Sequence, residues 1–296
     1  MRILVAGATG QLAQSLIEAS AQRAGWELTA MGRPALDLHA PLSLGRAIAA
    51  VCPHVVVNAA AYTAVDRAES EPDLAFAINR DGAGALARAA ADHGLPIVHL
   101  STDYVFDGRK PGCYVESDGT APEGIYGRSK LAGEEQVAAA NPRSIILRTA
   151  WVYSPFGSNF VKTMLRLAGE RPELRVVADQ RGNPTYAPHL ADAILSILPV
   201  LVEAPPRHGP WGVYHAAGQG DTTWHGLAQE VMAAAAARGR PHVPVRAITT
   251  EEYPTPARRP ANSRLSCDKL ANVFGITLPH WSEGVRECVG RLCSAA

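Results

Sequence analysis

The feature that most constrains the fold is a glycine-rich turn close to the amino terminus. Residues 3–6 form an apolar, strand-like run, and the segment G-A-T-G-Q-L-A (7–13) follows it and opens an alanine-rich helical stretch. Gly7 permits a tight turn, Gly10 lets the backbone approach a phosphate, and Ala13 stands where a third glycine is common. A pyrophosphate can sit on the free N–H groups at the positive end of such a helix. The pattern predicts a dinucleotide-binding unit.

Short β-branched runs alternate with alanine-rich stretches through the first half of the chain. Such alternation is typical of successive βαβ units, so we predict an α/β fold with a Rossmann-type, doubly wound parallel sheet. The expected strands are 3–6, 27–31, 55–58, 97–100 and 144–147, and the expected helices lie near 12–24, 42–50, 74–93 and 126–140.

Proline and glycine interrupt the chain more often after Thr149. This change predicts a domain boundary, because these residues punctuate loops and turns. We expect a dinucleotide-binding domain at 1–150 and a smaller C-terminal substrate lobe at 151–296, with part of 186–218 returning to the first domain. Helices are expected in the second half at 159–168, 189–202, 224–238 and 282–292.

Composition excludes several classes of protein. Lys+Arg and Asp+Glu both number 28, so no net charge favours nucleic acid or an acidic membrane surface, and no stretch of about 18 apolar residues predicts a membrane span. The five cysteines are scattered without a C-x-x-C pair, which argues against disulfides and zinc. His99, His189, His215 and His225 lack metal-like spacing and read as structural or exposed. We expect a cytoplasmic protein without a metal.

The second expected strand bears on the choice of cofactor. It ends in Met31-Gly32-Arg33, without the acidic residue that grips an adenosine ribose hydroxyl, while Arg33 could pair with a 2′-phosphate. This favours NADPH; if Arg33 is only a solvated surface residue, NADH is the alternative. Asp37 could contact the adenine or cap the next helix. The alanine run 59–61 follows the third strand and would let the backbone pass close to the cofactor.

A phenol and an ammonium group lie on one expected helix. Tyr126 and Lys130 are four residues apart, about 6 Å along a helix and on one face. A nearby cation lowers the pKa of a phenol, which would make Tyr126 a better proton relay. Thr102 follows the fourth strand and could hydrogen-bond a substrate carbonyl or the phenol. The constellation predicts general-acid chemistry at the carboxyl edge of the sheet.

With these motifs, essentially the whole chain resembles the extended short-chain dehydrogenase/reductase family. The resemblance rests on G-A-T-G-Q-L (7–12), N-A-A-A-Y-T-A-V-D-R-A-E-S-E-P (58–72), S-T-D-Y-V-F-D-G (101–108), Y-G-R-S-K-L-A-G-E (126–134), R-T-A-W-V-Y (148–153), D-Q-R-G-N-P-T (179–185) and Y-P-T-P-A-R-R-P-A-N-S-R-L (253–265). It implies reduction of the 4-keto group of a dTDP-sugar, dTDP-4-dehydro-L-rhamnose, to give dTDP-L-rhamnose.

The resemblance also implies roles for single residues. Tyr126 would donate a proton to the C4 oxygen, and Lys130 would bind the nicotinamide ribose and lower the tyrosine pKa. Thr102 would orient the keto oxygen, Asp103 would hold a sugar hydroxyl, and Trp151 would wall the sugar ring. Cofactor contacts would come from Gly7, Gly10, Gln11, Leu12, Arg33, Asp37, Leu38, Ala61, Tyr62, Thr63, Leu100, Tyr126 and Lys130.

Simpler interpretations exist for three of these positions. Trp151 could be a core aromatic of the second lobe, because large aromatic side chains dominate burial. Asp103 could cap a turn. Arg258 and Arg259 suit a diphosphate, since guanidinium groups match phosphate oxygens, but adjacent arginines between prolines also occur in exposed loops.

One departure from the family concerns a metal. In some members, two segments supply glutamates to a magnesium ion that is shared between subunits: the helix after P-T and the last helix. In this chain the first of these segments reads Tyr186-Ala187-Pro188-His189. A magnesium site is therefore doubtful, and we expect a monomer or a homodimer. Two other functions remain open: a nucleotide-sugar 4,6-dehydratase or epimerase, although Tyr104 replaces the glutamate of S-T-D-E, and a non-catalytic regulatory subunit like that of methionine adenosyltransferase.

Overall fold

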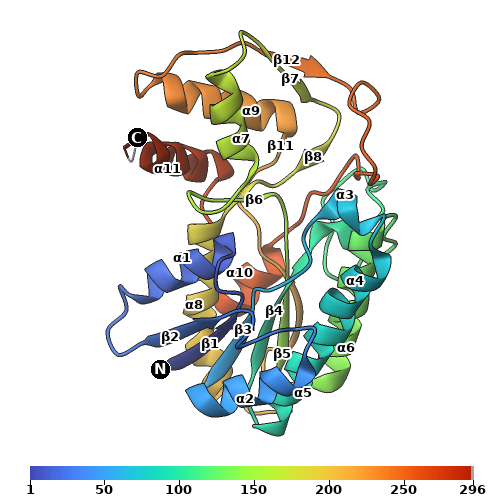
Figure 1. Ribbon diagram of the computed structural model, residues 1–296, viewed down its shortest axis with the longest axis vertical. Coiled ribbons are helices and arrows are strands. Elements are labelled where there is room, and N and C mark those ends of the chain that lie inside the picture. Colours follow the sequence, from blue (N-terminus) through green and yellow to red (C-terminus); the bar gives the residue numbers. More distant parts are fainter. Residues whose placement is uncertain (295–296) are drawn as a thin grey trace.

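A six-stranded parallel sheet forms the centre of the computed structural model, which describes residues 1–294 (Figure 1). Every pair of neighbouring strands runs in the same direction. Along the sheet the strands are β2 (Glu27–Met31), β1 (Arg2–Ala6), β3 (Val55–Asn58), β4 (Ile97–Thr102), β5 (Ser144–Thr149) and β10 (Gly212–His215). The predicted doubly wound sheet is confirmed, and all five expected strands belong to it.

The strand order reverses beside β1, which has β2 on one side and β3 on the other. In open α/β sheets, ligands bind at such a switch point, outside the carboxyl ends of the strands. The loops that follow β1, β3 and β4 leave the sheet at this edge, and they carry the motifs predicted to bind cofactor and substrate. The topology therefore brings segments 7–12, 59–63 and 102–104 to one edge.

Helices cover both faces of the sheet (Figure 1). On one face, α1 (Gln11–Ser20), α8 (Ala187–Glu203) and α10 (Asp268–Phe274) share an apolar core with the strands. On the other face, α2 (Pro41–Val51), α5 (Ala83–Asp92) and α6 (Ile125–Ala140) do the same. The central strands β1, β3, β4 and β5 are almost entirely buried, and most of their residues are apolar, as expected for strands covered on both faces.

The second lobe has an apolar core of its own, and Figure 1 shows it beyond one end of the sheet. Helices α7 (Phe160–Ala168), α9 (Trp224–Ala236) and α11 (Trp281–Ser294) supply most of its side chains. Its two-stranded pieces are β7 (Leu174–Val177) with β12 (Val245–Ile248), β8 (Arg181–Gly182) with β11 (Thr222–Thr223), and β6 (Val152–Tyr153) with β9 (Thr185–Tyr186). No helix within residues 1–294 has the length and apolar character needed to span a membrane.

Some elements differ from their predicted form. The expected helix 74–93 is three consecutive pieces, α4 (Pro72–Phe76), a π-helical segment η1 (Ala77–Gly82) and α5. Periodicity cannot reveal a π turn, which inserts a residue into an otherwise helical pattern. Three short helices were not predicted at all: α3 (Val65–Ala68), the 3-10 turn η2 (Asp103–Val105) and α10.

Candidate active site

The glycine-rich turn forms a cradle that fits a pyrophosphate. Gly7 has φ of 101°, and a Cβ there would lie 3.2 Å from the Ala60 nitrogen, so only glycine suits this close approach. Gly10 caps α1 without a side-chain hydrogen bond, and the space where its Cβ would project is open to at least 4 Å. The first turn of α1 carries no acidic residue. A phosphate can therefore approach uncapped N–H groups at the positive helix end.

Gln11 connects this turn to the second lobe. Its side-chain oxygen accepts hydrogen bonds from Ser154 Oγ and Asn159 Nδ2, both at 2.9 Å, and its Nε2 donates to the Val152 carbonyl at 3.4 Å. Asn159 also caps α7 by accepting from the Lys162 N–H at 3.1 Å. The family resemblance implied a cofactor contact for Gln11, but its hydrogen bonds to the second lobe were not predicted, because partners more than 140 positions away leave no local signal.

The residues expected at the adenosine end lie on the loop after β2. Arg33 is exposed and forms no ion pair within the described part of the chain. The Asp37 carboxylate accepts from the His39 N–H at 3.0 Å, and Leu38 is buried in the core beneath α2 and α5. An exposed, unpaired guanidinium at this position fits the 2′-phosphate of NADPH.

The loop after β3 is held by an asparagine that sequence reasoning missed. Asn79 lies in η1; its Oδ1 accepts from the Tyr62 N–H at 2.8 Å, and its Nδ2 donates to the Tyr62 carbonyl and to Ser129 Oγ, both at 3.0 Å. Ser129 lies on α6 between Tyr126 and Lys130. One buried amide thus fixes the loop of Ala61, Tyr62 and Thr63 against the helix that carries the phenol and the ammonium. The sequence carries no local signal for this role, because helical periodicity does not reveal the π turn that holds Asn79.

Two contacts fix the start of α6. Its N-cap, Gly124, offers no side chain, and the Glu69 carboxylate accepts from the Ile125 N–H at 2.8 Å instead. A Cβ at Gly127 would lie 2.2 Å from the Tyr104 carbonyl oxygen, so glycine allows the loop after β4 to reach the helix. The rings of Tyr104 and Tyr126 consequently pack edge to face, with centroids 5.6 Å apart.

Tyr126 is a partly exposed phenol that stays protonated at neutral pH. Desolvation by the surrounding protein raises its pKa to about 12; the nearby Thr102 hydroxyl opposes this shift, and the Asp103 carboxylate reinforces it. The sequence predicted that Lys130 would lower this pKa, but in the structure burial outweighs any such effect. Lys130 donates instead to the Leu100 carbonyl at 2.6 Å. Burial also lowers the pKa of Lys130 to about 8, against the opposing influence of Glu134.

Asp103 is a buried carboxylate with one oxygen unused. Its side chain is 2% exposed; Oδ1 accepts from Thr102 Oγ1 at 3.0 Å, while Oδ2 has no partner. Burial raises its pKa to about 6, and the neighbouring hydroxyl groups of Ser263 and Thr102 oppose the shift. Ser263 belongs to the 253–265 segment of the second lobe, so this carboxylate lies where the two lobes meet.

A buried ion pair between β5 and α6 lies next to the end of β4. Arg148 on β5 binds both carboxylate oxygens of Glu134 on α6, the shortest contact being 2.7 Å, and both side chains are at most 5% exposed. Ser101 Oγ also donates to Glu134. This network fixes α6 against the strand that precedes Thr102.

Trp151 follows β5 with an unusual backbone conformation. Its φ is 46°, in the left-handed region that bulky residues seldom adopt. Its ring stacks on that of Trp224 at the start of α9, with centroids 3.7 Å apart and planes inclined by 7°. Phe160 packs against Trp224 in turn, with ring centroids 4.8 Å apart. A line of aromatic rings therefore leads from the end of β5 into the second lobe.

This line ends at a cavity of about 590 Å³ between α7, β7, α9 and the 253–259 segment. Three aromatic side chains and four guanidinium groups line it: Phe160, Trp224, Tyr253, Arg166, Arg171, Arg175 and Arg259. Such a lining suits a flat base and a diphosphate.

The two adjacent arginines of the 253–259 segment behave differently. Arg259 lines the cavity, binds Asp66 at 2.9 Å through Nη2, and leaves a buried Nη1 without a partner. Arg258 is exposed and pairs with Glu123 at 2.8 Å. Of the two, Arg259 is therefore the one placed to meet a ligand in the cavity.

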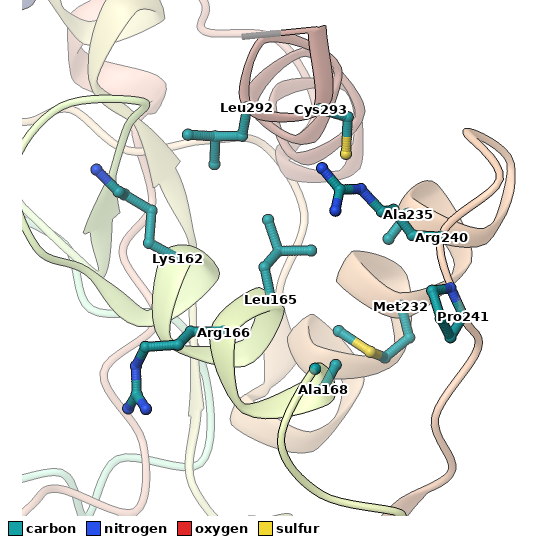
Figure 2. Close-up of a pocket in the computed structure, with 11 residues that line it drawn as sticks. Lys162, Leu165, Arg166, Ala168, Met232, Ala235, Arg240, Pro241, Leu292 and Cys293 are labelled. Atoms are coloured by element: carbon teal, nitrogen blue, oxygen red, sulfur yellow. The ribbon is translucent and has the colours of Figure 1, made fainter. Parts of the chain in front are cut away.

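A smaller cavity, of about 300 Å³, lies between α7, α9 and α11 (Figure 2). Leu165, Met232 and Leu292 line it together with Lys162 and Arg240, as Figure 2 shows. None of the residues predicted for the site lines it.

The residues present do not fit the bridging magnesium of some family members. His189, in the first turn of α8, pairs with Glu287 of α11, with Nε2 and Oε2 3.1 Å apart. Magnesium prefers oxygen ligands in octahedral geometry, which an imidazole nitrogen does not supply. Across residues 1–294, no group of three His, Cys, Asp or Glu side chains is arranged to hold a metal ion.

Comparisons with known proteins agree with this architecture. Residues 1–294 match the family model described as RmlD substrate binding domain. A dTDP-4-dehydrorhamnose reductase of Sinorhizobium fredii is 50% identical over 292 residues, which cover 99% of this chain and 98% of that protein.

Solved structures give the same result. A dTDP-4-dehydrorhamnose reductase of Clostridium acetobutylicum superposes with a TM-score of 0.91 at 37% identity, over 99% of both chains. A dTDP-4-dehydrorhamnose reductase of Bacillus anthracis in complex with NADP gives 0.89 at 36% identity, over 98% of this chain and 99% of that one. The chain is therefore an oxidoreductase and belongs to the RmlD substrate binding domain family, together with the dTDP-4-dehydrorhamnose reductases.

Proposed function

We propose that this protein uses NADPH to reduce the 4-keto group of dTDP-4-dehydro-L-rhamnose to the alcohol of dTDP-L-rhamnose. The observation that carries the proposal is the position of Tyr126, Thr102 and Lys130 together near the carboxyl edge of the sheet. The glycine turn lies at the same edge, and the aromatic line from Trp151 leads to a cavity suited to a nucleotide.

Tyr126 would act as the proton donor. A phenol whose pKa is raised to about 12 stays protonated at neutral pH and can give its proton to the C4 oxygen. Bound NADPH supplies the hydride that the C4 carbon gains, so the ketone is reduced and the nicotinamide is oxidised. Thr102 would hold the keto oxygen, because its hydroxyl stands at the carboxyl end of β4 close enough to the phenol to influence its pKa. Lys130 would stabilise the phenolate left behind and bind the nicotinamide ribose.

The sugar and the nucleotide would occupy neighbouring parts of the cleft. Asp103 Oδ2 has no partner in the protein and would accept a hydrogen bond from a sugar hydroxyl. Trp151 would wall the ring. In the larger cavity, the base would pack on Phe160 or Trp224, and Arg259 would contact the diphosphate through its unpaired Nη1. This arrangement uses both lobes for one substrate.

The loop after β4 supports reduction over elimination of water. A 4,6-dehydratase needs an acid/base pair, and Tyr104 stands where that class has a glutamate. Burial raises the pKa of Tyr104 above its usual value, so the phenol stays protonated and cannot replace a carboxylate base.

The test is a turnover experiment with the purified chain. We expect dTDP-4-dehydro-L-rhamnose to be converted to dTDP-L-rhamnose with one NADPH oxidised for each product formed, and NADH to be used less well. Product identity is checked by mass spectrometry and NMR. A dehydratase or epimerase would return its cofactor unchanged, and a regulatory subunit would bind the cofactor without turnover; either result would refute the proposal.

A further inference from the structure

A buried histidine contacts the lysine of the proposed catalytic pair. Asn58 ends β3, His99 lies on β4 and Lys130 on α6, and their side chains are 0%, 1% and 2% exposed. Asn58 Nδ2 lies 3.0 Å from His99 Nδ1, and His99 Nε2 lies 3.5 Å from Lys130 Nζ. The sequence indicated that His99 is a structural or exposed residue. The structure makes it the middle of a chain of three polar side chains beneath the active site.

The directions of these hydrogen bonds follow from one backbone contact. Asn58 Oδ1 accepts from the Ala60 N–H at 3.2 Å, so the amide nitrogen must be the group that faces the imidazole. An amide nitrogen only donates, which makes His99 Nδ1 the acceptor. A neutral imidazole then carries its proton on Nε2, the atom that faces Lys130. Burial and the nearby Lys130 both lower the pKa of His99 well below its ordinary value, so the ring is neutral.

A protonated Nε2 discriminates between the two forms of Lys130. An ammonium group carries only N–H donors, so it cannot accept a hydrogen bond from Nε2–H. An amine has a lone pair and can accept one. A hydrogen bond to the uncharged form of a group disfavours the charged form. We propose that His99 is a positioning residue whose Nε2–H favours the amine form of Lys130. The effect of His99 on turnover rests on the proposed function.

The other charged groups around Lys130 do not supply this effect. Glu134, on the same helix face, favours the ammonium, but Arg148 binds both of its carboxylate oxygens. Tyr126 is a neutral phenol on the same helix. The Leu100 carbonyl accepts from Lys130 in either form, because both the amine and the ammonium can donate to it. His99 is thus the neighbour that distinguishes the two forms.

The protonation of Lys130 can be followed without any assay of activity. The chain has only four lysines, Lys110, Lys130, Lys162 and Lys269. In protein labelled with ¹³C-lysine, the ε-methylene signal of Lys130, assigned with Lys130→Arg, reports its titration. We expect the midpoint to rise by about one pH unit in His99→Gln, because the glutamine oxygen can turn toward the ammonium and accept from it.

A second buried histidine provides the matched control. His215 is 0% exposed, and its Nδ1 lies 3.1 Å from the Ser266 carbonyl oxygen, away from Lys130. His215→Gln should therefore leave the titration of Lys130 unchanged. An equal shift in both variants would show that any loosening of the core moves Lys130, and would overturn the proposal.

Two further measurements separate the outcomes. The ¹⁵N spectrum of the wild-type imidazoles shows which nitrogen of His99 carries the proton, even if His99→Gln fails to fold; a proton on Nδ1 would overturn the proposal. In the turnover assay, we expect the alkaline limb of the kcat profile to move upward with the Lys130 midpoint. An active enzyme in which His99→Gln shifts neither quantity would refute this inference alone, whereas an inactive wild-type protein would refute the proposed function.

Discussion

Replacing Asp103 by asparagine should stabilise the protein at neutral pH while impairing the reaction. The wild-type carboxylate is 2% exposed, its Oδ2 has no partner, and its pKa is raised from 3.8 to about 6. A shift of about two units corresponds to roughly 3 kcal/mol at about 1.4 kcal/mol per unit. Folding therefore bears a cost of that order when the group is ionised. Asparagine has the same shape and never ionises.

The sign of the pH dependence follows from the raised pKa. The folded pKa of Asp103 exceeds its unfolded value. Below the unfolded pKa the carboxyl is protonated in both states and does not destabilise the folded wild type. Above the folded pKa it is ionised in both states, and the full destabilisation is present. The free energy of unfolding of Asp103→Asn, minus that of the wild type, should thus grow by roughly 3 kcal/mol between about pH 3 and pH 7, most of it below about pH 6.

Urea denaturation followed by circular dichroism over this pH range measures the difference directly. A variant whose stability relative to the wild type is the same at every pH would show that Asp103 is not a desolvated acid, and would refute the reasoning. The same variant should raise KM for the sugar nucleotide, because the amide nitrogen cannot accept the hydroxyl hydrogen bond assigned to Oδ2. Wild-type KM would remove Asp103 from the proposed substrate site.

Three other substitutions test separate parts of the site. Tyr126→Phe should lower kcat by roughly 10²–10⁴-fold and keep NADPH affinity, measured by fluorescence titration, because only the proton donor is lost; full turnover would disprove that role. Arg33→Ala should weaken NADPH binding by about 10–100-fold and leave NADH binding unchanged, as expected for one hydrogen-bonded charge pair. Glu134→Gln should reduce the free energy of unfolding by about 3–5 kcal/mol, because it leaves Arg148 buried without its counter-ion. The control Glu170→Gln breaks an exposed pair between Arg166 of α7 and Glu170, just beyond the end of that helix, and should cost less than about 1 kcal/mol.

The sheet could be predicted because its signals are local. Each central strand is a short apolar run followed by a turn, and Gly7 marks the first of these turns without any information from distant residues. The edge of the sheet at which the motifs meet follows from the parallel topology alone. For the same reason Tyr126 and Thr102, which lie on neighbouring elements, could be expected near each other.

The supporting residues could not be predicted because their partners are distant in sequence. Asn79 acts on the Tyr62 backbone from a π turn that helical periodicity conceals. Glu69 caps a helix that begins 56 positions later. The pKa of Tyr126 was expected to fall because its spacing from Lys130 was visible, whereas the burial that raises it depends on the whole fold. Sequence spacing shows which groups lie near one another, but not how far the fold removes them from solvent.

The hydrogen bonds of Gln11 constrain any attempt to recombine this chain with a relative. A chimera that keeps the first 150 residues and grafts a foreign sugar-binding half onto them would also replace Ser154 and Asn159. If the grafted half lacked donors at those two positions, the Gln11 side-chain oxygen would lose both partners, at a cost of up to about 1–3 kcal/mol, the range for a buried acceptor, because Gln11 is only partly buried. Transplanting a new specificity therefore requires moving residue 11 together with the graft.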